Sequence, residues 1–507
     1  MNAATRPDRA ERLRAVVARG LGLAFDETKY TFLEDVLARR AQRAGRSVET
    51  YLAHIEAEPR AELRALAPEL TVGETYFFRN VEQFRALAEV ALPDRMRARE
   101  SERRLRFLSA GCASGEEPYS LAMLTREHVT DPSWDVSILA VDVNSVALAR
   151  AMRACFTPWA LRETAPDIER RWFHAEGREL RLANTAREHV RFEEHNLVDD
   201  DPRLWPDEAY DVVFCRNVLM YFTPESALAV VDRIRRSLAP GGYLFLGHAE
   251  TLRGLSNDFH LCHTHGTFYY QRRDRAGKTG KTDVPVGSSL PPGALSIPSV
   301  GPDEGAGTWV ERIRHASERI EAITGARLRG SPVASPTERA RANLAPALDL
   351  LAEERYADAL ESVGALPSGA ATDPDALLLR AVLQTHGGRL AEAEETCRRV
   401  LEIDELNAGA HYVLALCREG AGDPKGAVDE DQVAVYLDGS FAMPRLHLGL
   451  LARKNGDLET GRRELGQALV LLLREDPSRV LLFGGGFRRE ALRALCRAEL
   501  EACGGHP

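Results

Sequence analysis

The hydrophobic residues of this chain follow three patterns along its length. Residues 1–95 place Leu, Ala and Val at helical spacing among charged residues, without strand-like alternation. Residues 96–272 contain short apolar runs that alternate with helical stretches, and residues from 336 onward are helical again. We therefore predict a multi-domain protein with an N-terminal α-helical domain, a central α/β domain and a C-terminal all-α domain.

The apolar runs of the central part have the length and composition of strands buried on both faces. They are Phe107-Leu108, Val136–Val141, Tyr210–Phe214 and Tyr243–Leu246. Strands of this kind separated by helices predict a parallel sheet in a doubly wound, Rossmann-like fold. Residues 157–192 interrupt the alternation, and we expect a small antiparallel β subdomain there. Its expected strands are Trp172-Phe173, Glu179–Leu182 and His189–Phe192.

The C-terminal part, residues 336–507, repeats with a period of 34 residues. The recurring turns are Glu354–Ala359, Gly388–Ala393, Gly422–Ala427 and Gly456–Gly461, and a small residue stands seven positions before each of them. A helix–turn–helix of this period, with small residues where the helices touch, is the tetratricopeptide pattern. We expect a solenoid closed by a capping helix over residues 484–502. Its groove would bind an unknown protein or peptide, or the array would be a stabilising appendage.

Residues 273–335 differ from both neighbouring parts in composition. They are rich in Pro, Gly, Ser and charged residues, which is typical of a flexible linker. Within them, Trp309–Ile323 has helical spacing, and its purpose is open.

Composition and charge exclude several classes of protein. The 507 residues carry a formal net charge of −10, which disfavours nucleic acid as a partner. The eight cysteines form no CxxC pair, as expected for reduced cytosolic thiols. The N-terminus has no apolar signal-peptide core, and no apolar stretch is long enough to span a membrane. We expect a cytoplasmic protein without membrane insertion.

The stretch Phe107–Tyr119, with the sequence FLSAGCASGEEPY, has the pattern of a ligand-binding turn. A strand that ends in small residues and turns into a helix brings backbone N–H groups close to a nucleotide-like ligand. Glu116 and Glu117 stand where a pyrophosphate would lie, with no Lys or Arg beside them. Two carboxylates suit a cationic ligand, and S-adenosylmethionine has a sulfonium, an ammonium group and ribose hydroxyls. The alternative is an ordinary tight turn.

Polar residues follow the other predicted strands. Asp142 ends the second strand, where an acidic residue usually binds ribose hydroxyls. Asn196-Leu197 ends the next one, and Asn196 would either bond an adenine edge or cap a helix. Arg216, Asn217 and Tyr221 follow Tyr210–Phe214 and should line the ligand crevice. The cluster around His260 and His263 suggests a metal, but its alternation favours a late strand, and we expect no metal site.

Two arginine-containing segments precede the sheet. Arg79 follows three aromatic residues, Tyr76, Phe77 and Phe78, which would wedge into a core. Its guanidinium would then either grip a carboxylate or extend to water. The second segment is a strip of arginines on one helix, which would be either a solvated face or a docking surface for an acidic partner helix. It consists of Arg39, Arg40, Arg43 and Arg46.

In combination and in this order, these motifs resemble the CheR family of chemoreceptor glutamate O-methyltransferases, in the form with C-terminal tetratricopeptide repeats. The resemblance covers roughly residues 10–272. It is carried by Thr75–Arg79, Gly111–Tyr119, Val141-Asp142, Asn196-Leu197, Cys215–Phe222 and Leu238–Glu250. The chain departs from the family at Tyr76, where an acid is frequent, and at the small residues that follow Gly111.

The resemblance implies S-adenosylmethionine as the cofactor and glutamate side chains of chemoreceptors as the substrate. It implies that Arg79 and Tyr221 face the reacting methyl group and the substrate carboxylate. It implies that the arginine strip docks on the acidic methylation helices of the receptor. The implied cofactor-binding residues are Thr75, Arg79, Gly111, Glu117, Asp142, Asn196, Leu197, Arg216 and Asn217. The remaining alternatives are a methyltransferase for another carboxylate and a scaffold that only senses the cofactor while its repeats recruit partners.

Overall fold

The computed structural model describes residues 6–248, 250–273, 344–353, 355–366, 373–485 and 487–504. The chain forms two compact units, Met1–Pro292 and Gly293–Pro507, and each is described by itself. The expected linker over 273–335 and the segment 309–323 lie outside the described residues, apart from Arg273.

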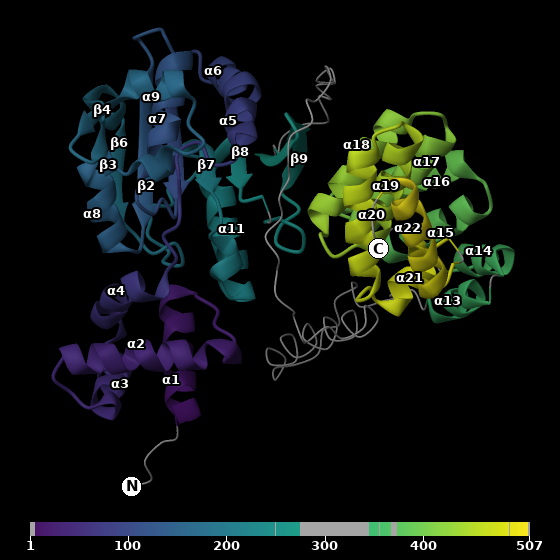
Figure 1. Ribbon diagram of the computed structural model, residues 1–507, viewed down its shortest axis with the longest axis horizontal. Helices are drawn as coiled ribbons and strands as arrows, with labels where there is room; N and C mark the ends of the chain where they lie inside the picture. Colours follow the sequence, from purple (N-terminus) through teal and green to yellow (C-terminus); the bar gives the residue numbers. More distant parts are fainter. Residues whose placement is uncertain are drawn as a thin grey trace, which may run out of the picture. The chain divides into compact units, whose positions relative to one another are not determined.

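Four helices at the N-terminus form a domain with its own core (Figure 1). They are α1 (Arg6–Leu21), α2 (Tyr30–Arg43), α3 (Val48–Ala57) and α4 (Pro59–Leu70). Leu13, Leu33, Leu52 and Leu66, one from each helix, are fully buried in that core. The apolar spacing of the sequence thus gives four amphipathic helices packed on one another.

The boundary of this helical domain differs from the predicted one at residue 95. Helices α5 (Val81–Ala86) and α6 (Leu92–Ala98), with the π-helical turn Leu87–Ala91 between them, pack on the sheet. Phe77, Phe84 and Leu92 are buried in the core of the sheet domain and not among the N-terminal helices. The helical domain therefore ends with α4, because helical spacing alone does not show which core a helix joins.

The central sheet has seven strands in the order β6-β2-β1-β7-β8-β10-β9 (Figure 1). Five are parallel: β1 (Arg104–Ala110), β2 (Asp135–Asp142), β6 (Val190–Glu194), β7 (Tyr210–Cys215) and β8 (Leu238–Leu246). The antiparallel strands β10 (Thr267–Arg272) and β9 (Phe259–Thr264) complete one edge. Helices α7 (Glu116–His128), α8 (Ser145–Arg153) and α11 (Pro224–Ser237) connect the strands. The predicted Rossmann-like fold is confirmed, and the histidine-containing segment at 260–265 is a strand with its following turn.

The order of the strands fixes where a ligand can bind. Strand β1 lies between β2 and β7, with Ser109 paired to Ala140 on one side and to Phe214 on the other. From β1 the chain continues to β2 and β6 on one side and then crosses to β7 and β8 on the other, so the carboxyl ends of β1 and β7 form a topological switch point. The glycine turn, Asp142 and the loop after β7 all meet at this edge.

A second, three-stranded antiparallel sheet has the order β3-β5-β4. It consists of β3 (Cys155–Phe156), β4 (Phe173–Glu176) and β5 (Glu179–Leu182). The prediction that His189–Phe192 belongs to this small sheet is wrong. Val190–Glu194 is β6 of the main sheet and runs parallel to β2, with Ile138 paired to Val190. A strand of four or five residues has the same pattern in the two settings, and only the pairing partner distinguishes them.

The second unit is a stack of antiparallel helix pairs. They are α13/α14 (Ala345–Ala352, Tyr356–Gly364), α15/α16 (Pro374–His386, Leu390–Ile403), α17/α18 (Ala408–Gly420, Pro424–Leu437) and α19/α20 (Ala442–Lys454, Leu458–Leu472), followed by α21 (Pro477–Phe483) and α22 (Arg489–Ala502). Gly388, Gly422 and Gly456 turn between paired helices with φ of +70°, +83° and +81°. A Cβ on Gly449 would lie 2.6 Å from Leu465 Cγ, so this helix pair requires a small residue there. The predicted repeats are confirmed.

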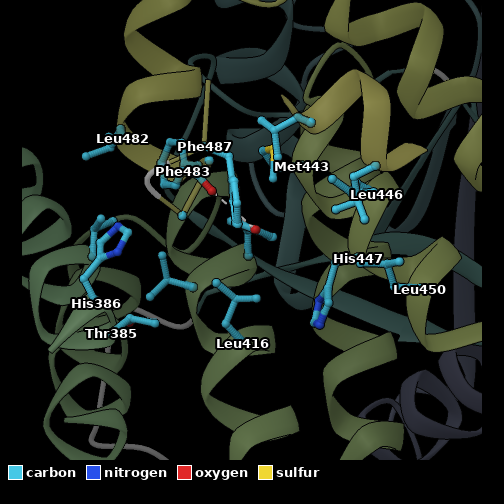
Figure 2. A pocket seen from close by; sticks show the side chains of 17 residues that line it. Thr385, His386, Leu416, Met443, Leu446, His447, Leu450, Leu482, Phe483 and Phe487 are labelled. Carbon is cyan, nitrogen blue, oxygen red and sulfur yellow. Dashed lines mark hydrogen bonds between the residues drawn. The ribbon is translucent and has the colours of Figure 1, made fainter. Parts of the chain in front are cut away.

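A cavity of about 260 Å³ lies between the first helices of these pairs and the segment around α21 (Figure 2). Leu416, Met443 and Leu450 form part of its apolar wall, and Phe483 and Phe487 face it from the C-terminal segment. His447 adds a polar group, with Nδ1 2.6 Å from Asp431 Oδ2 and Nε2 3.0 Å from Glu419 Oε2.

Among the described residues of the whole chain, no helix is both long and apolar enough to cross a membrane.

Candidate active site

The glycine turn after β1 allows neighbouring segments of the chain to pack closely against it. Gly111 has φ +78° and donates its N–H to the carbonyl of Val141 at 2.8 Å. A Cβ at this position would lie only 2.4 Å from Val218 Cγ2, so glycine lets the loop after β7 approach the turn. Gly115 has φ +95° and would meet the Cβ of Ala151 at 2.7 Å. Both glycines are thus required by conformation and by space.

Asp142 joins the turn to the second strand. Its Oδ2 accepts a hydrogen bond from the Ala113 N–H at 2.8 Å, and its Oδ1 accepts one from the Asn144 N–H at 2.7 Å. The side chain is almost fully buried, and burial raises its pKa, while these backbone N–H groups act in the opposite direction. A carboxylate has more acceptor sites than these two bonds use, so Asp142 can still accept from ligand hydroxyls.

Glu117 and Arg216 form a buried pair at the start of α7. Arg216 Nη1 lies 3.4 Å from Glu117 Oε2, and Ser109 Oγ donates to Glu117 Oε1 at 2.7 Å. Burial raises the pKa of Glu117 and lowers the pKa of Arg216, and each group favours the charged form of the other. The Nε of Arg216 is buried without a hydrogen-bond partner among the described residues. The pair therefore retains donor and acceptor capacity for a ligand.

Arg79 lies beside this pair on a segment that the aromatic residues anchor. Phe77 is fully buried, and the N–H of Phe78 donates to Ser120 Oγ of α7 at 3.0 Å. The expectation of an aromatic wedge is therefore confirmed. The Arg79 carbonyl accepts a hydrogen bond from Arg216 Nη2. Its half-exposed guanidinium donates to the Glu74 carbonyl at 3.3 Å and has no ion pair with a described carboxylate.

Thr75 precedes this segment and is half-buried, and its part in cofactor binding stays a prediction. Asn217 follows Arg216 with φ +57°, in the left-handed region. This conformation turns the chain sharply at the end of β7 and is sparsely populated by residues other than glycine.

Glu250 is a site residue for which we predicted no specific role from the sequence. Its carboxylate accepts four backbone N–H groups from the loops after β7 and β8. These are the N–H groups of Asn217 (2.6 Å), Gly247 (2.7 Å), Val218 (2.9 Å) and Met220 (3.2 Å). It is a positioning residue for the segment from Arg216 to Tyr221. The available signal was an acid four residues after the apolar run Tyr243–Leu246, in the sequence GHAE.

Tyr221 lies on the short 3-10 helix Leu219–Tyr221, and 39% of it is exposed. Its carbonyl accepts a hydrogen bond from the N–H of Ala24 at 2.8 Å. Leu23 forms a β-bridge with Phe222, and the N–H of Thr223 donates to the carbonyl of Gly22 at 2.8 Å. The chain after α1 is thus paired with the loop that carries Tyr221.

Asn196 and Leu197 lie at the same edge of the sheet. Asn196 Nδ2 donates to the carbonyl of Gly20 at 2.7 Å, and Leu197 is buried. Thr71 Oγ1, just after α4, accepts a hydrogen bond from Asn144 Nδ2 at 3.0 Å. Asn196 therefore joins the helical domain to the sheet, and a contact between its side chain and adenine stays a prediction.

The arginine strip on α2 is largely paired within the helical domain. Arg39 and Arg43 share Glu69 of α4, at 3.2 and 2.9 Å. Arg40 lies 3.5 Å from Glu62 and 3.2 Å from the Tyr51 hydroxyl. Arg46 lies in the exposed turn after α2. The side chain of Arg43 is still 64% exposed, so the strip remains accessible.

The residues at the switch point fit an adenosyl sulfonium compound. The crevice edge offers acceptors for hydroxyl and ammonium groups at Asp142 and Glu117, and an unsatisfied guanidinium donor for a carboxylate at Arg216. The glycines fix the backbone of the turn through their close contacts with Val218 and Ala151.

Comparisons with known proteins agree with this chemistry. The family model described as "CheR methyltransferase, SAM binding domain" matches residues 73–268. Chemotaxis protein methyltransferase 2 of Vibrio cholerae is 33% identical over 255 residues, which are 49% of this chain and 88% of that protein. Chemotaxis protein methyltransferase Cher2 of Pseudomonas putida is 30% identical over 271 residues, 52% of this chain and 97% of that protein.

One further relative extends beyond the catalytic part. The probable biofilm formation methyltransferase WspC of Pseudomonas putida is 27% identical over 450 residues, 87% of this chain and 94% of that protein. An alignment of this length must include helical repeats, because the sequence before them has only about 340 residues. The combination of catalytic part and repeats therefore recurs in a relative.

Proposed function

This chain belongs to the CheR methyltransferase family, and on that premise we propose that it transfers the methyl group of S-adenosylmethionine to glutamate side chains of chemoreceptors. The observation that carries the acceptor part is Arg79, a half-exposed guanidinium without an ion-pairing carboxylate among the described residues. Arg79 is fixed at the switch point through its own carbonyl and Arg216. A carboxylate is the group that such an arginine binds best.

The roles of the binding residues follow from their charges. Glu117 would hold the ammonium group of the cofactor, and Arg216 its carboxylate. Asp142 would accept from the ribose hydroxyls, and the Gly111 turn would pack against the adenosine. Thr75, Asn196, Leu197 and Asn217 would complete the wall of the crevice. When bound, S-adenosylmethionine supplies a methyl group activated by the positive charge on sulfur.

The acceptor needs little chemical assistance from the protein. A glutamate side chain has an unperturbed pKa of about 4.3 and is ionised at neutral pH, so no general base is required. The work of Arg79 and Tyr221 is then to hold one carboxylate oxygen in line with the methyl group. Such positioning can contribute several kcal/mol. Arg79 is suited to this because it is half-exposed. It can orient the acceptor carboxylate without neutralising it in a buried ion pair.

The experiment follows transfer of tritium from labelled S-adenosylmethionine to receptor-containing membranes, with base-labile release of methanol. The wild-type protein should label the receptor, and Arg79→Ala should lose transfer while remaining folded. Arg85→Ala changes an exposed arginine of α5 and is the matched control, expected to behave as wild type. Labelling of a small carboxylic acid in place of the receptor, or binding of cofactor without transfer, would instead support one of the alternative functions.

We further propose that the arginine strip of α2 docks on the acidic helices of the receptor. Its ion pairs with Glu62 and Glu69 are partly solvent-exposed, and pairs of this kind contribute only about 0–1 kcal/mol each. Receptor carboxylates can therefore replace them at small cost. Arg43→Glu should raise the KM for receptor and leave the binding of S-adenosylhomocysteine unchanged. An unaltered KM would contradict the docking role.

For the repeats, we propose that the cavity of Figure 2 receives a bulky apolar side chain from a protein partner of the signalling complex. Its wall is mostly apolar, and its size suits one or two side chains. Leu416→Glu would place a charge in the wall of the cavity and should abolish partner binding. Leu473→Glu changes an exposed leucine at the C-terminal end of α20 and is the control. Loss of partner binding in both variants, or in neither, would contradict the assignment.

A further inference from the structure

Two arginines lie against the ring of one tyrosine beside the candidate active site. The guanidinium carbon of Arg162 is 3.8 Å from the centroid of the Tyr76 ring, and that of Arg79 is 5.7 Å from it. Arg162 also lies 4.6 Å from the ring of Trp159, which is 71% exposed. Arg79, Tyr76, Arg162 and Trp159 thus form a continuous row of alternating cations and aromatic rings, which we call the cation–aromatic row.

The backbone holds this row in place. The N–H of Phe77 donates to the carbonyl of Ala160 at 2.9 Å, which joins the Arg79 segment to the 3-10 helix Pro158–Leu161. Phe77 also packs edge-on against Phe156, with ring centroids 4.8 Å apart. Arg162 Nη1 donates to the carbonyl of Trp159 at 3.0 Å, so its guanidinium is oriented before any ligand binds.

Neither arginine of the row has an ion pair with a carboxylate in the part of the chain that the structure describes. Glu163, Glu116 and Glu117 are acids that act on this neighbourhood, the last of them on Arg79. Burial raises the pKa of Tyr76, with Glu163 as the next cause, and Arg162 acts on the buried Glu116 from a distance. Some exposed arginines on the neighbouring elements are paired instead, for example Arg153 with Glu179 and Arg171 with Glu127. In a chain of net charge −10, the row is a local cationic surface.

We propose that Arg162 binds a second carboxylate of the acceptor protein, while Arg79 orients the glutamate that is methylated. The inferred ligand is an acidic helix with two carboxylates about one turn apart. The two guanidinium carbons lie 3.8 and 5.7 Å from one ring centroid, so they are at most about 9.5 Å apart. Side chains at i and i+3 or i+4 of a helix have Cβ atoms roughly 5–6 Å apart, and long carboxylate side chains that diverge from such positions can reach both arginines. Trp159 adds an exposed apolar surface for the neighbouring turn of that helix. This inference rests on the proposed function and specifies which glutamates the site accepts.

The expected signature is in acceptor binding and not in the chemical step. Arg162 contacts neither Glu117, Arg216 nor Asp142, so its loss should leave cofactor binding unchanged. A partly exposed charge pair is worth up to about a fivefold change in affinity. Arg162→Ala should therefore raise the KM for receptor by about that factor and change kcat by less than about twofold. Arg162→Lys keeps the charge but loses the planar stacking on the rings, so its KM for receptor should lie between those of the wild type and Arg162→Ala.

The test uses the full chain with two acceptors, a receptor and its variant in which glutamines replace the carboxylates flanking the methylated glutamate. Arg162→Ala should raise the KM for the first acceptor and have no effect on the second. Trp159→Ala should raise the KM for both acceptors, since its contact is apolar. Arg178→Ala, an exposed arginine in the turn of the small sheet, is the control and should behave as wild type. Calorimetry with S-adenosylhomocysteine verifies that each variant is folded and binds cofactor.

The outcomes separate this inference from the proposed function. If the wild-type chain labels neither acceptor, the proposed function fails. If it labels the receptor and Arg162→Ala has a wild-type KM, only the role of Arg162 fails. The same holds if Arg162→Ala raises the KM equally for both acceptors, because the effect would then not come from a second carboxylate.

Discussion

Glu250 offers a sharp test of how the loops at the carboxyl edge are held. Replacing it by glutamine keeps one carbonyl-type oxygen and turns the other into an NH2 group, which faces two backbone N–H donors. Oε1 accepts from Val218 and Met220, and Oε2 from Asn217 and Gly247, so either orientation of the amide loses two of the four bonds. Each donor left without a partner costs about 1–3 kcal/mol. We expect a loss of about 3 kcal/mol for Glu250→Gln and more for Glu250→Ala.

The assay is thermal unfolding, and it must distinguish the transitions of the two units, because a protein with two units need not unfold in one transition. S-adenosylhomocysteine should raise the midpoint temperature of thermal unfolding only for the unit that binds it. For a unit of 150–250 residues, 1 kcal/mol corresponds to about 2–4 °C, so Glu250→Gln should lower this transition by roughly 6–12 °C. The kcat should fall as well, since the same bonds fix the segment from Arg216 to Tyr221.

Glu188→Gln, at an exposed glutamate of the same unit, is the control and should change neither the transition nor kcat. The reasoning would be refuted if Glu250→Gln unfolded within about 2 °C of the wild type. It would also be refuted if the loss of stability left kcat unchanged, because the carboxylate would then not position the catalytic loop.

Three further predictions test other parts of the chain. Gly111→Ala should lower the transition that S-adenosylhomocysteine raises, because its Cβ would lie 2.4 Å from Val218 Cγ2; Val218→Ala in the same chain should restore part of the loss. Burial raises the pKa of Asp142, so binding of S-adenosylhomocysteine, measured by calorimetry, should weaken on acidification at a higher pH than an ordinary aspartate would require; Asp142→Asn should bind weakly at every pH. In the repeat unit, burial raises the pKa of Asp431 to about 7. Burial lowers the pKa of His447, but its contacts with the carboxylates of Asp431 and Glu419 together outweigh burial and raise it. Both folded values exceed the unfolded ones, so the folded unit binds more protons, and its thermal transition should fall as the pH rises through about 7; the double variant Asp431→Asn/His447→Gln should flatten this dependence.

Much of the architecture could be predicted because it depends on local patterns. Buried parallel strands gave apolar runs such as Val136–Val141, which lies within β2. The 34-residue spacing of glycines, such as Gly388 and Gly422, gave the helix pairs, since each glycine has the positive φ that the turn requires. In these places the constraint on each residue comes from its own backbone or from its immediate neighbours.

The misplaced elements depend on contacts between distant residues. Val190–Glu194 has the composition of either sheet, and its pairing with β2 decides the matter. The helices from Val81 to Ala98 have the same spacing as the N-terminal ones but join the core of the sheet domain. The bond from Asn196 to Gly20 and the four bonds to Glu250 likewise join segments that no local pattern connects. Candidate site residues could be found at strand ends, but their partners could not.

The β-bridge between Leu23 and Phe222 has a consequence for how the enzyme would respond to its substrate. It ties the connection after α1 to the loop of Tyr221, and the bond from Asn196 to Gly20 adds a second attachment within a few residues. A receptor that presses on the helical domain would thus transmit that force directly to a tyrosine proposed to face the methyl group. Receptor binding and methyl transfer would then be mechanically linked, and weakening the contacts between these two segments would uncouple them.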